Sequence, residues 1–312
     1  MNMKKFITFL ILTFSLSAVL IPGGSHAQVI ESFVSETAGA EDAQAEENSP
    51  GSYYTGKEKY FKIFTKENKN SGRVDFYASN SGYCTYQFEV GFTELTNAET
   101  SVPVPYYGVT GASKKDVLLF SLAPKNKGKY RYKYKFKFHV GDPGSAKHDD
   151  SYKYIIPFEK GTSRKVQQGY GGAFSHAGWM KYSIDFPVPV GTKVCAARDG
   201  IVVLIKSDSN MAGKTREFMQ YGNYIVIAHN DGTFSEYVHL KQGGNIVKPG
   251  DRVAAGDAIG LSGNTGFSTS PHLHFMVVKP NKIGLWSIPV KFLGDDGSAI
   301  ELSQGKSYIS CR

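Results

Sequence analysis

Short segments in which apolar and polar residues alternate dominate the chain from about Ser52 onward. Residues 72–78 (GRVDFYA) and 86–92 (YQFEVGF) are two examples, and turn residues bound each of them. Because successive side chains on a strand point to opposite faces, this pattern predicts β-strands with one buried face. Strands that recur about every ten residues are typical of a β-sandwich. We therefore expect a β-sandwich domain over residues 52–157.

The alternation is clearest over residues 129–140 (KYRYKYKFKFHV). The bases are Lys129, Arg131, Lys133, Lys135 and Lys137, and the aromatic residues are Tyr130, Tyr132, Tyr134, Phe136 and Phe138. A strand would place all the bases on one face and all the rings on the other. Proteins that bind single-stranded nucleic acid need exposed rings beside the charges. The pattern therefore favours a sandwich core with a solvated basic face over nucleic-acid binding.

The second half, residues 158–312, also predicts β structure alone. Its apolar runs are short and none has a helical period; they cover 200–206, 223–228, 233–240, 253–261 and 272–278. Asn230 to Thr233 (NDGT) predicts a hairpin turn, which would place His229 near its tip.

The N-terminus predicts export. Lys4 and Lys5 precede an apolar run over residues 6–21, and Ser25-His26-Ala27 resembles a cleavage site. A transmembrane anchor is the alternative, but sixteen apolar residues are short for a bilayer span. We therefore expect a signal peptide over residues 1–27, a periplasmic or secreted mature protein, and no stable membrane anchor after its removal.

Composition and charge separate an acidic leader from a basic folded part. The chain is 41% apolar and contains 20 Phe and 19 Tyr, which excludes a disordered protein and favours β structure. Residues 28–51 carry six acids and no base, which predicts a flexible acidic leader. Residues 52–312 carry 34 bases against 22 acids, a net charge of +12, and such a surface attracts anionic polymers.

The three cysteines cannot all pair within the chain. Cys195 lies in an apolar strand-like segment and is interpreted as a small buried residue. Export permits a disulfide, so Cys84 and Cys311 are a possible pair.

The pentapeptide Pro271 to Phe275 (PHLHF) carries the most informative chemistry. On a strand His272 and His274 point to the same side, which is a start for a metal site. His239, His176 and Asp185 are available as partners. Catalytic zinc takes three protein ligands from His and carboxylate side chains, and His176, Asp185 and His274 would make such a set.

The order of motifs over residues 166–278 resembles the lysostaphin-type zinc endopeptidases, which cut peptide bonds in bacterial peptidoglycan. The motifs are His176, 185–202 (DFPVPVGTKVCAARDGIV), 222–227 (GNYIVI), 237–240 (YVHL), 247–253 (VKPGDRV), 263–266 (GNTG) and 271–275 (PHLHF). The resemblance implies an antiparallel sheet with a hammerhead-like, half-barrel topology over residues 158–312. It implies Zn²⁺ held by His176, Asp185 and His274, with His239 and His272 as catalytic residues. The implied partners are peptidoglycan peptides.

One departure from the family pattern concerns His176. Eight residues separate it from Asp185, so the two cannot share one tight turn and His176 must arrive from a loop. We favour a long loop between His176 and Asp185 that still places His176 at the site, and we expect its Trp179 and Met180 to line the cleft. The alternative is a catalytically impaired module that binds cell wall or regulates another hydrolase.

Overall fold

The computed structural model describes residues 29–33, 44–46, 60–68, 70–282 and 284–311. The predicted signal peptide lies outside these residues. Within the described part, no helix is long and apolar enough to cross a membrane.

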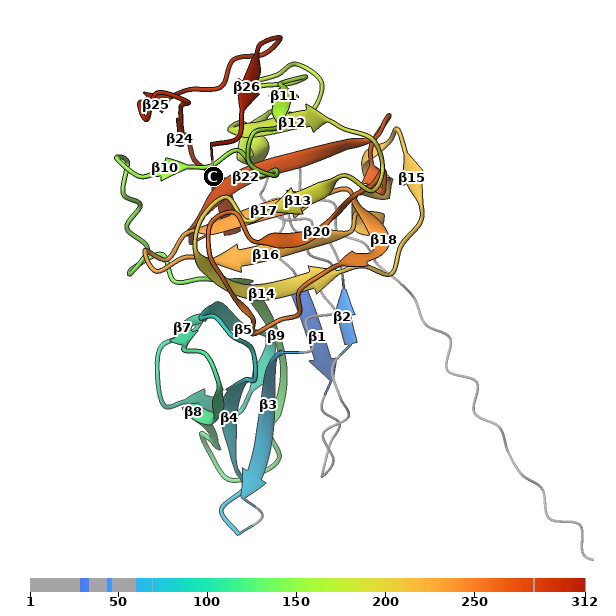
Figure 1. Cartoon of the computed structure of the whole chain (residues 1–312). Helices are drawn as coiled ribbons and strands as arrows, with labels where there is room; N and C mark the ends of the chain where they lie inside the picture. The colour runs from blue at the N-terminus through green and yellow to red at the C-terminus, as the bar shows by residue number, and fades with distance from the viewer. Residues whose placement is uncertain (1–28, 34–43, 47–59, 69, 283, 312) are drawn as a thin grey trace, which may run out of the picture.

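Two antiparallel sheets form the expected N-terminal sandwich, drawn in blue to green in Figure 1. The first has the order β2 (Gln44–Glu46), β1 (Val29–Phe33), β9 (Arg131–Val140), β5 (Tyr86–Thr96) and β7 (Tyr106–Thr110). The second has the order β3 (Phe61–Asn68), β4 (Arg73–Asn80), β8 (Lys114–Pro124) and β6 (Ala98–Thr100). Their facing sides enclose one aromatic core. The all-β prediction is confirmed.

The burial of β9 follows its sequence alternation. Tyr132, Tyr134, Phe136 and Phe138 are buried, and the bases between them face outward. At the centre of this core the Phe76 ring stacks on Phe120 at 4.6 Å and meets Tyr134 edge-on at 4.9 Å. Outside, Lys133 lies 3.4 Å from Glu94 and Lys137 lies 4.0 Å from Glu89, so acids on β5 partly neutralise the basic face.

The structure differs from the expected flexible leader at two places. β1 pairs antiparallel with β9, and β2 pairs with β1, so residues 29–33 and 44–46 extend the sandwich sheet. The sequence of β1 (VIESF) is rich in β-branched and aromatic residues, which suits a strand. Residues 34–43 and 47–51 of the predicted leader lie outside the described residues.

The second half is built on an open seven-stranded antiparallel sheet. Its order is β12 (Ser183–Pro187), β22 (His272–Asn281), β17 (Phe234–Val238), β16 (Tyr224–Ala228), β14 (Gly200–Lys206) and β19 (Arg252–Val253), with β23 (Gly284–Ser287) paired to β22. A three-stranded sheet of β13 (Lys193–Cys195), β20 (Ala258–Ser262) and β18 (Leu240–Asn245) packs beside it. The described strands form no closed barrel. The predicted hairpin is present, because β16 and β17 pair on either side of Asn230 to Thr233.

Short elements complete this half. They are β10 (Lys153–Tyr154), β24 (Lys291–Leu293) and β25 (Ala299–Ile300), β11 (Ser163–Lys165) and β26 (Ser307–Ile309), β15 (Ala212–Gly213) and β21 (Gly266–Phe267), and the 3₁₀ turns η1 (Gly178–Met180) and η2 (Arg216–Tyr221). Since β10 already pairs with β24, the chain joins the second half a few residues before the predicted boundary at 157/158.

The large sheet is covered on both faces. On β16, Ile225 and Ile227 pack against the three-stranded sheet, while Tyr224 and Val226 join the core shared with the sandwich. This explains why the sequence of β16 (YIVIA) is continuously apolar instead of alternating. Between the two halves, the Gln87 side chain donates to the Asn281 carbonyl at 2.7 Å.

The suggested Cys84–Cys311 disulfide is wrong. No disulfide joins the three cysteines of the structure. Cys84 is buried in the sandwich core, whereas Cys311 follows β26 and its thiol lies 3.6 Å from the Leu293 carbonyl of β24. Cys195 is buried as predicted, and its burial raises the pKa of the thiol to about 11.

Buried His229 gives the fold a defined acid sensitivity. Its Nδ1 lies 2.8 Å from the Asp199 carbonyl, and burial lowers the pKa of the imidazole to about 4. The unfolded chain takes up this proton near pH 6.5, so the native state loses stability as the pH falls from 6.5 towards 4. The expected loss is about 3 kcal/mol at most.

Urea unfolding at pH 7.5 and pH 4.5 measures this loss. We expect the His229→Gln variant to lose less stability on acidification than the wild type. His139, whose pKa burial also lowers to about 4, accounts for a further part of the acid sensitivity. Equal losses in wild type and variant would contradict the assignment.

Candidate metal centre

Strand pairing brings Asp185 and His274 together. Asp185 lies on β12 and His274 on β22, and the antiparallel register sets them directly opposite each other. Asp185 Oδ1 and His274 Nδ1 are 2.8 Å apart. Both side chains are buried, and His272, two residues before His274, lies on the same face of β22, as the His-x-His pattern predicts.

His176 reaches the same place from a loop. Its Nδ1 lies 2.8 Å from the Gly169 carbonyl, and its Nε2 lies 3.2 Å from Asp185 Oδ1. The intervening residues form η1, whose Trp179 and Met180 are buried in the core shared with the sandwich. They do not wall the cleft, so that expectation is wrong. These two apolar side chains instead hold the segment between His176 and Asp185 against the core, and the chain then continues into β12.

The three side chains fit a metal ion. One candidate ligand atom from each of His176, Asp185 and His274 lies within 4.8 Å of the other two. Because a carbonyl only accepts, His176 Nδ1 must donate to Gly169, which leaves a lone pair on Nε2 of the neutral ring. This buried Nε2 makes no hydrogen bond with the residues that the structure describes, although it faces the carboxylate. A cation between the two would satisfy both.

The protonation state of Asp185 agrees with this. Burial acts to raise the pKa of its carboxyl, but the neighbouring imidazoles of His176 and His274 outweigh burial and hold the pKa below its ordinary value. The site therefore offers one anionic oxygen donor and two imidazoles, a set typical of catalytic zinc.

His239 and His272 lie beside this cluster, with ring centroids 4.6 Å apart. His239 follows β17 and has a left-handed backbone with φ +65°, which is rare for residues other than glycine. Its Nδ1 lies 2.6 Å from the Thr265 carbonyl, and the Nδ1 of His272 lies 2.7 Å from the Ser270 carbonyl. Burial, together with the neighbouring His272 and His274, lowers the pKa of His239, so this imidazole is neutral at physiological pH.

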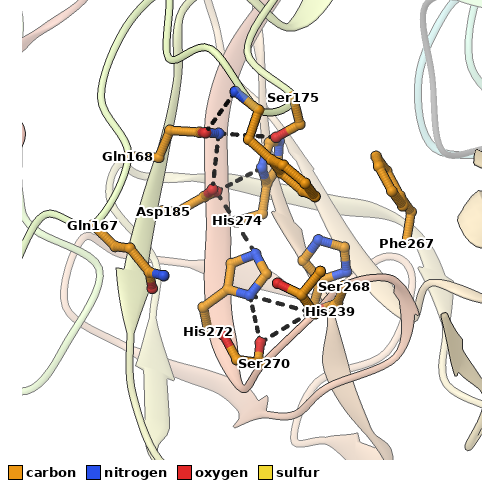
Figure 2. Close-up of a pocket in the computed structure, with 12 residues that line it drawn as sticks. Gln167, Gln168, Ser175, Asp185, His239, Phe267, Ser268, Ser270, His272 and His274 are labelled. Atoms are coloured by element: carbon orange, nitrogen blue, oxygen red, sulfur yellow. Dashed lines mark hydrogen bonds and ion pairs between the residues drawn. The ribbon is translucent and has the colours of Figure 1, made fainter. Parts of the chain in front are cut away.

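A cleft of about 300 Å³ opens onto these groups (Figure 2). Phe174 and Phe267 stack across part of it with ring centroids 5.7 Å apart. Residues 208–221 are not among its lining residues. Their β15 instead pairs with β21, the strand that carries Phe267.

Gln168 is a site residue that the sequence did not reveal. Its side chain lies 3.2 Å from Asp185 Oδ2, and its main chain forms an antiparallel bridge with Asp185. A Gln in the run QQGYGG, over residues 167–172, has no distinctive spacing. Only the contacts of Gln168 with Asp185 on β12 identify it as a site residue.

A comparison with protein families matches residues 180–284 to peptidase family M23. The matched range contains Asp185, His239, His272 and His274, and it begins after His176. The chain carries an M23 peptidase domain.

Curated proteins similar to this M23 domain include a peptidoglycan DD-endopeptidase and lysostaphin. Peptidoglycan DD-endopeptidase ShyA of Vibrio cholerae is 42% identical over 94 residues, which cover 30% of this chain and 19% of that protein. Lysostaphin of Staphylococcus simulans is 38% identical over 133 residues, which cover 42% of this chain and 24% of that protein. The chain thus matches less than a quarter of the length of each. The solved catalytic domain of lysostaphin is 28% identical, with a TM-score of 0.28, over 45% of this chain and 88% of that one.

Proposed function

We propose that the protein is an exported zinc metallo-endopeptidase that hydrolyses peptide bonds in peptidoglycan, either in cross-links or in stem peptides. The observation that carries the proposal is the convergence of His176, Asp185 and His274 from a loop and two strands, with His239 and His272 at their side. The M23 domain and the names of the relatives support the reaction class.

His176, Asp185 and His274 would hold the zinc ion. When bound, zinc lowers the pKa of a coordinated water and polarises the scissile carbonyl. The buried carboxylate reduces the charge of the site by one, and the buried imidazoles exclude bulk water from one side of it. The open side is the cleft, through which a peptide can enter.

His239 and His272 would handle the proton and the oxyanion. A ring nitrogen that donates to a carbonyl leaves the other nitrogen of a neutral imidazole with a lone pair. The Nδ1 contacts to Thr265 and Ser270 therefore leave each Nε2 as the atom that accepts a proton. The protonated ring can then stabilise a developing oxyanion.

Export and charge support the substrate class. The predicted signal peptide would deliver the chain to the cell wall, and the net charge of +12 on residues 52–312 would favour an anionic wall polymer. The alternative is an impaired module that binds cell wall or regulates another hydrolase. The return of His176 to the cluster favours the hydrolase, because the eight-residue separation does not displace this ligand candidate.

We expect the purified mature protein to bind about one zinc ion per chain and to cleave defined muropeptides. Removing the metal with a chelator should abolish cleavage, and adding zinc back should restore it. Metal analysis gives the zinc content, and mass spectrometry of the products gives the bond that is cut. A preparation that contains no zinc and cleaves at full rate would contradict the proposal.

A further inference from the structure

The Gln168 side chain uses both ends of its amide inside the site. The Phe174 backbone N–H donates to Gln168 Oε1 at 3.3 Å, and Gln168 Nε2 donates to Ser175 Oγ at 2.9 Å and to Asp185 Oδ2 at 3.2 Å (Figure 2). A backbone N–H requires an oxygen and a carboxylate requires an N–H, so the two contacts fix which end of the amide points where.

This arrangement divides the two oxygens of Asp185 between two tasks. Oδ2 accepts from Gln168. Oδ1 faces the imidazoles instead, lying 3.2 Å from His176 Nε2 and 2.8 Å from His274 Nδ1. One oxygen is therefore held by the amide, and the other is presented to the metal-ligand candidates.

The same short segment also orients His176. The Gly169 carbonyl, next to Gln168, accepts from His176 Nδ1 at 2.8 Å. In addition, Gln168 binds the backbone of Phe174 and the hydroxyl of Ser175, the two residues that precede His176. Residues 168 and 169 thus position two of the three candidate ligands, which come from different elements.

We propose that Gln168 is the positioning residue of this metal centre. It turns Asp185 so that a single oxygen meets the metal, and it ties the loop that carries His176 to the same carboxylate. This inference rests on the proposed zinc function. Partners that orient metal ligands through hydrogen bonds typically change metal affinity by about 10-fold to 100-fold when they are lost.

Gly172 provides an independent way to disturb Gln168. A Cβ at this position would lie 2.2 Å from Gln168 Cγ and 2.7 Å from its Cδ, which no real side chain tolerates. The Gly172→Ala change therefore pushes the Gln168 side chain away without altering it chemically. In a protein with Gln168→Ala those two atoms are absent, and the remaining close contact of the Cβ, 3.1 Å to the Gly169 carbonyl, needs a shift of only a few tenths of an ångström.

The first experiment compares zinc affinities by chelator competition. We expect Gln168→Leu to bind zinc about 10-fold to 100-fold more weakly than wild type. Gln242→Leu is the matched control, because this side chain is exposed on β18 and lies outside the cleft lining, and its zinc affinity should equal that of wild type. The visible spectrum of the cobalt-loaded Gln168→Leu protein should also shift, which a loss of fold stability alone would not cause.

The second experiment is a double-mutant cycle on zinc affinity with Gln168→Ala and Gly172→Ala. Each single variant should lose affinity, and the double variant should bind zinc no more weakly than Gln168→Ala alone. The cycle also covers the case in which the leucine variant fails to fold. Additive losses would show that Gly172 acts separately from Gln168 and would overturn the proposal.

The outcomes separate this inference from the proposed function. A wild-type protein that binds zinc and cleaves muropeptides, together with a Gln168→Leu variant of unchanged affinity and spectrum, overturns the role of Gln168 alone. A wild-type protein without zinc affinity overturns both.

Discussion

Replacing His274 by alanine is expected to release the zinc ion and to lower muropeptide cleavage by about 10³-fold or more. The side chain is buried opposite Asp185, and its loss leaves only two of the three proposed ligands and an enlarged cavity. A bound metal supplies several kcal/mol of transition-state stabilisation, and each 1.4 kcal/mol corresponds to about a tenfold change in rate. Zinc content and the rate of muropeptide cleavage, measured on the same preparation, test the prediction.

His139→Ala is the matched control. His139 lies on β9, in the sandwich and outside the residues that line the cleft, so the variant should keep both zinc and activity. If His274→Ala retained one zinc ion and cleaved as fast as wild type, His274 would not be a ligand.

Changing His239 to asparagine is expected to lower kcat by about 10²-fold to 10⁴-fold, the usual range for loss of a general acid–base group. Bound zinc should remain, because His239 is not one of the three ligand candidates. Asparagine is the appropriate replacement because it tolerates the left-handed backbone at this position better than most residues. Steady-state kinetics and metal analysis together distinguish this outcome from loss of a ligand.

His272→Asn gives the companion measurement. A large fall in kcat for only one of the two variants would identify that histidine as the main proton acceptor. Loss of zinc from His239→Asn would contradict the division between ligands and proton-handling residues. Unchanged kcat in both variants would remove the two histidines from the mechanism.

Local patterns in the sequence were sufficient for the strands and for part of the site. Alternation predicted the inward rings of β9, because burial of one face acts on every second residue. The same period predicted that His272 and His274 share a side. The position of His176 was harder to predict, because the path of the eight residues between it and Asp185 cannot be read from the sequence. Its position depends on the burial of Trp179 and Met180, which are distant in the chain from the core that they enter.

Features that depend on tertiary contact were not predictable. The strands β1 and β2 form because the edge of β9 is available to them, and an acidic segment viewed alone does not show that edge. Cysteine spacing does not report how far apart Cys84 and Cys311 lie in the fold. Gln168 acquires its role only through hydrogen bonds to residues 6 to 17 positions away.

The doubly covered sheet makes the sandwich part of the peptidase fold instead of an attached module. On β22, His272 and His274 occupy one end of a face whose other end, at Met276 and Val278, packs into the core shared with the sandwich. A shortened protein that began after the sandwich would expose this apolar surface to water, and surfaces of that kind promote aggregation. The second half would then need a new covering, so we expect a protein truncated before this half to be less soluble than the whole chain.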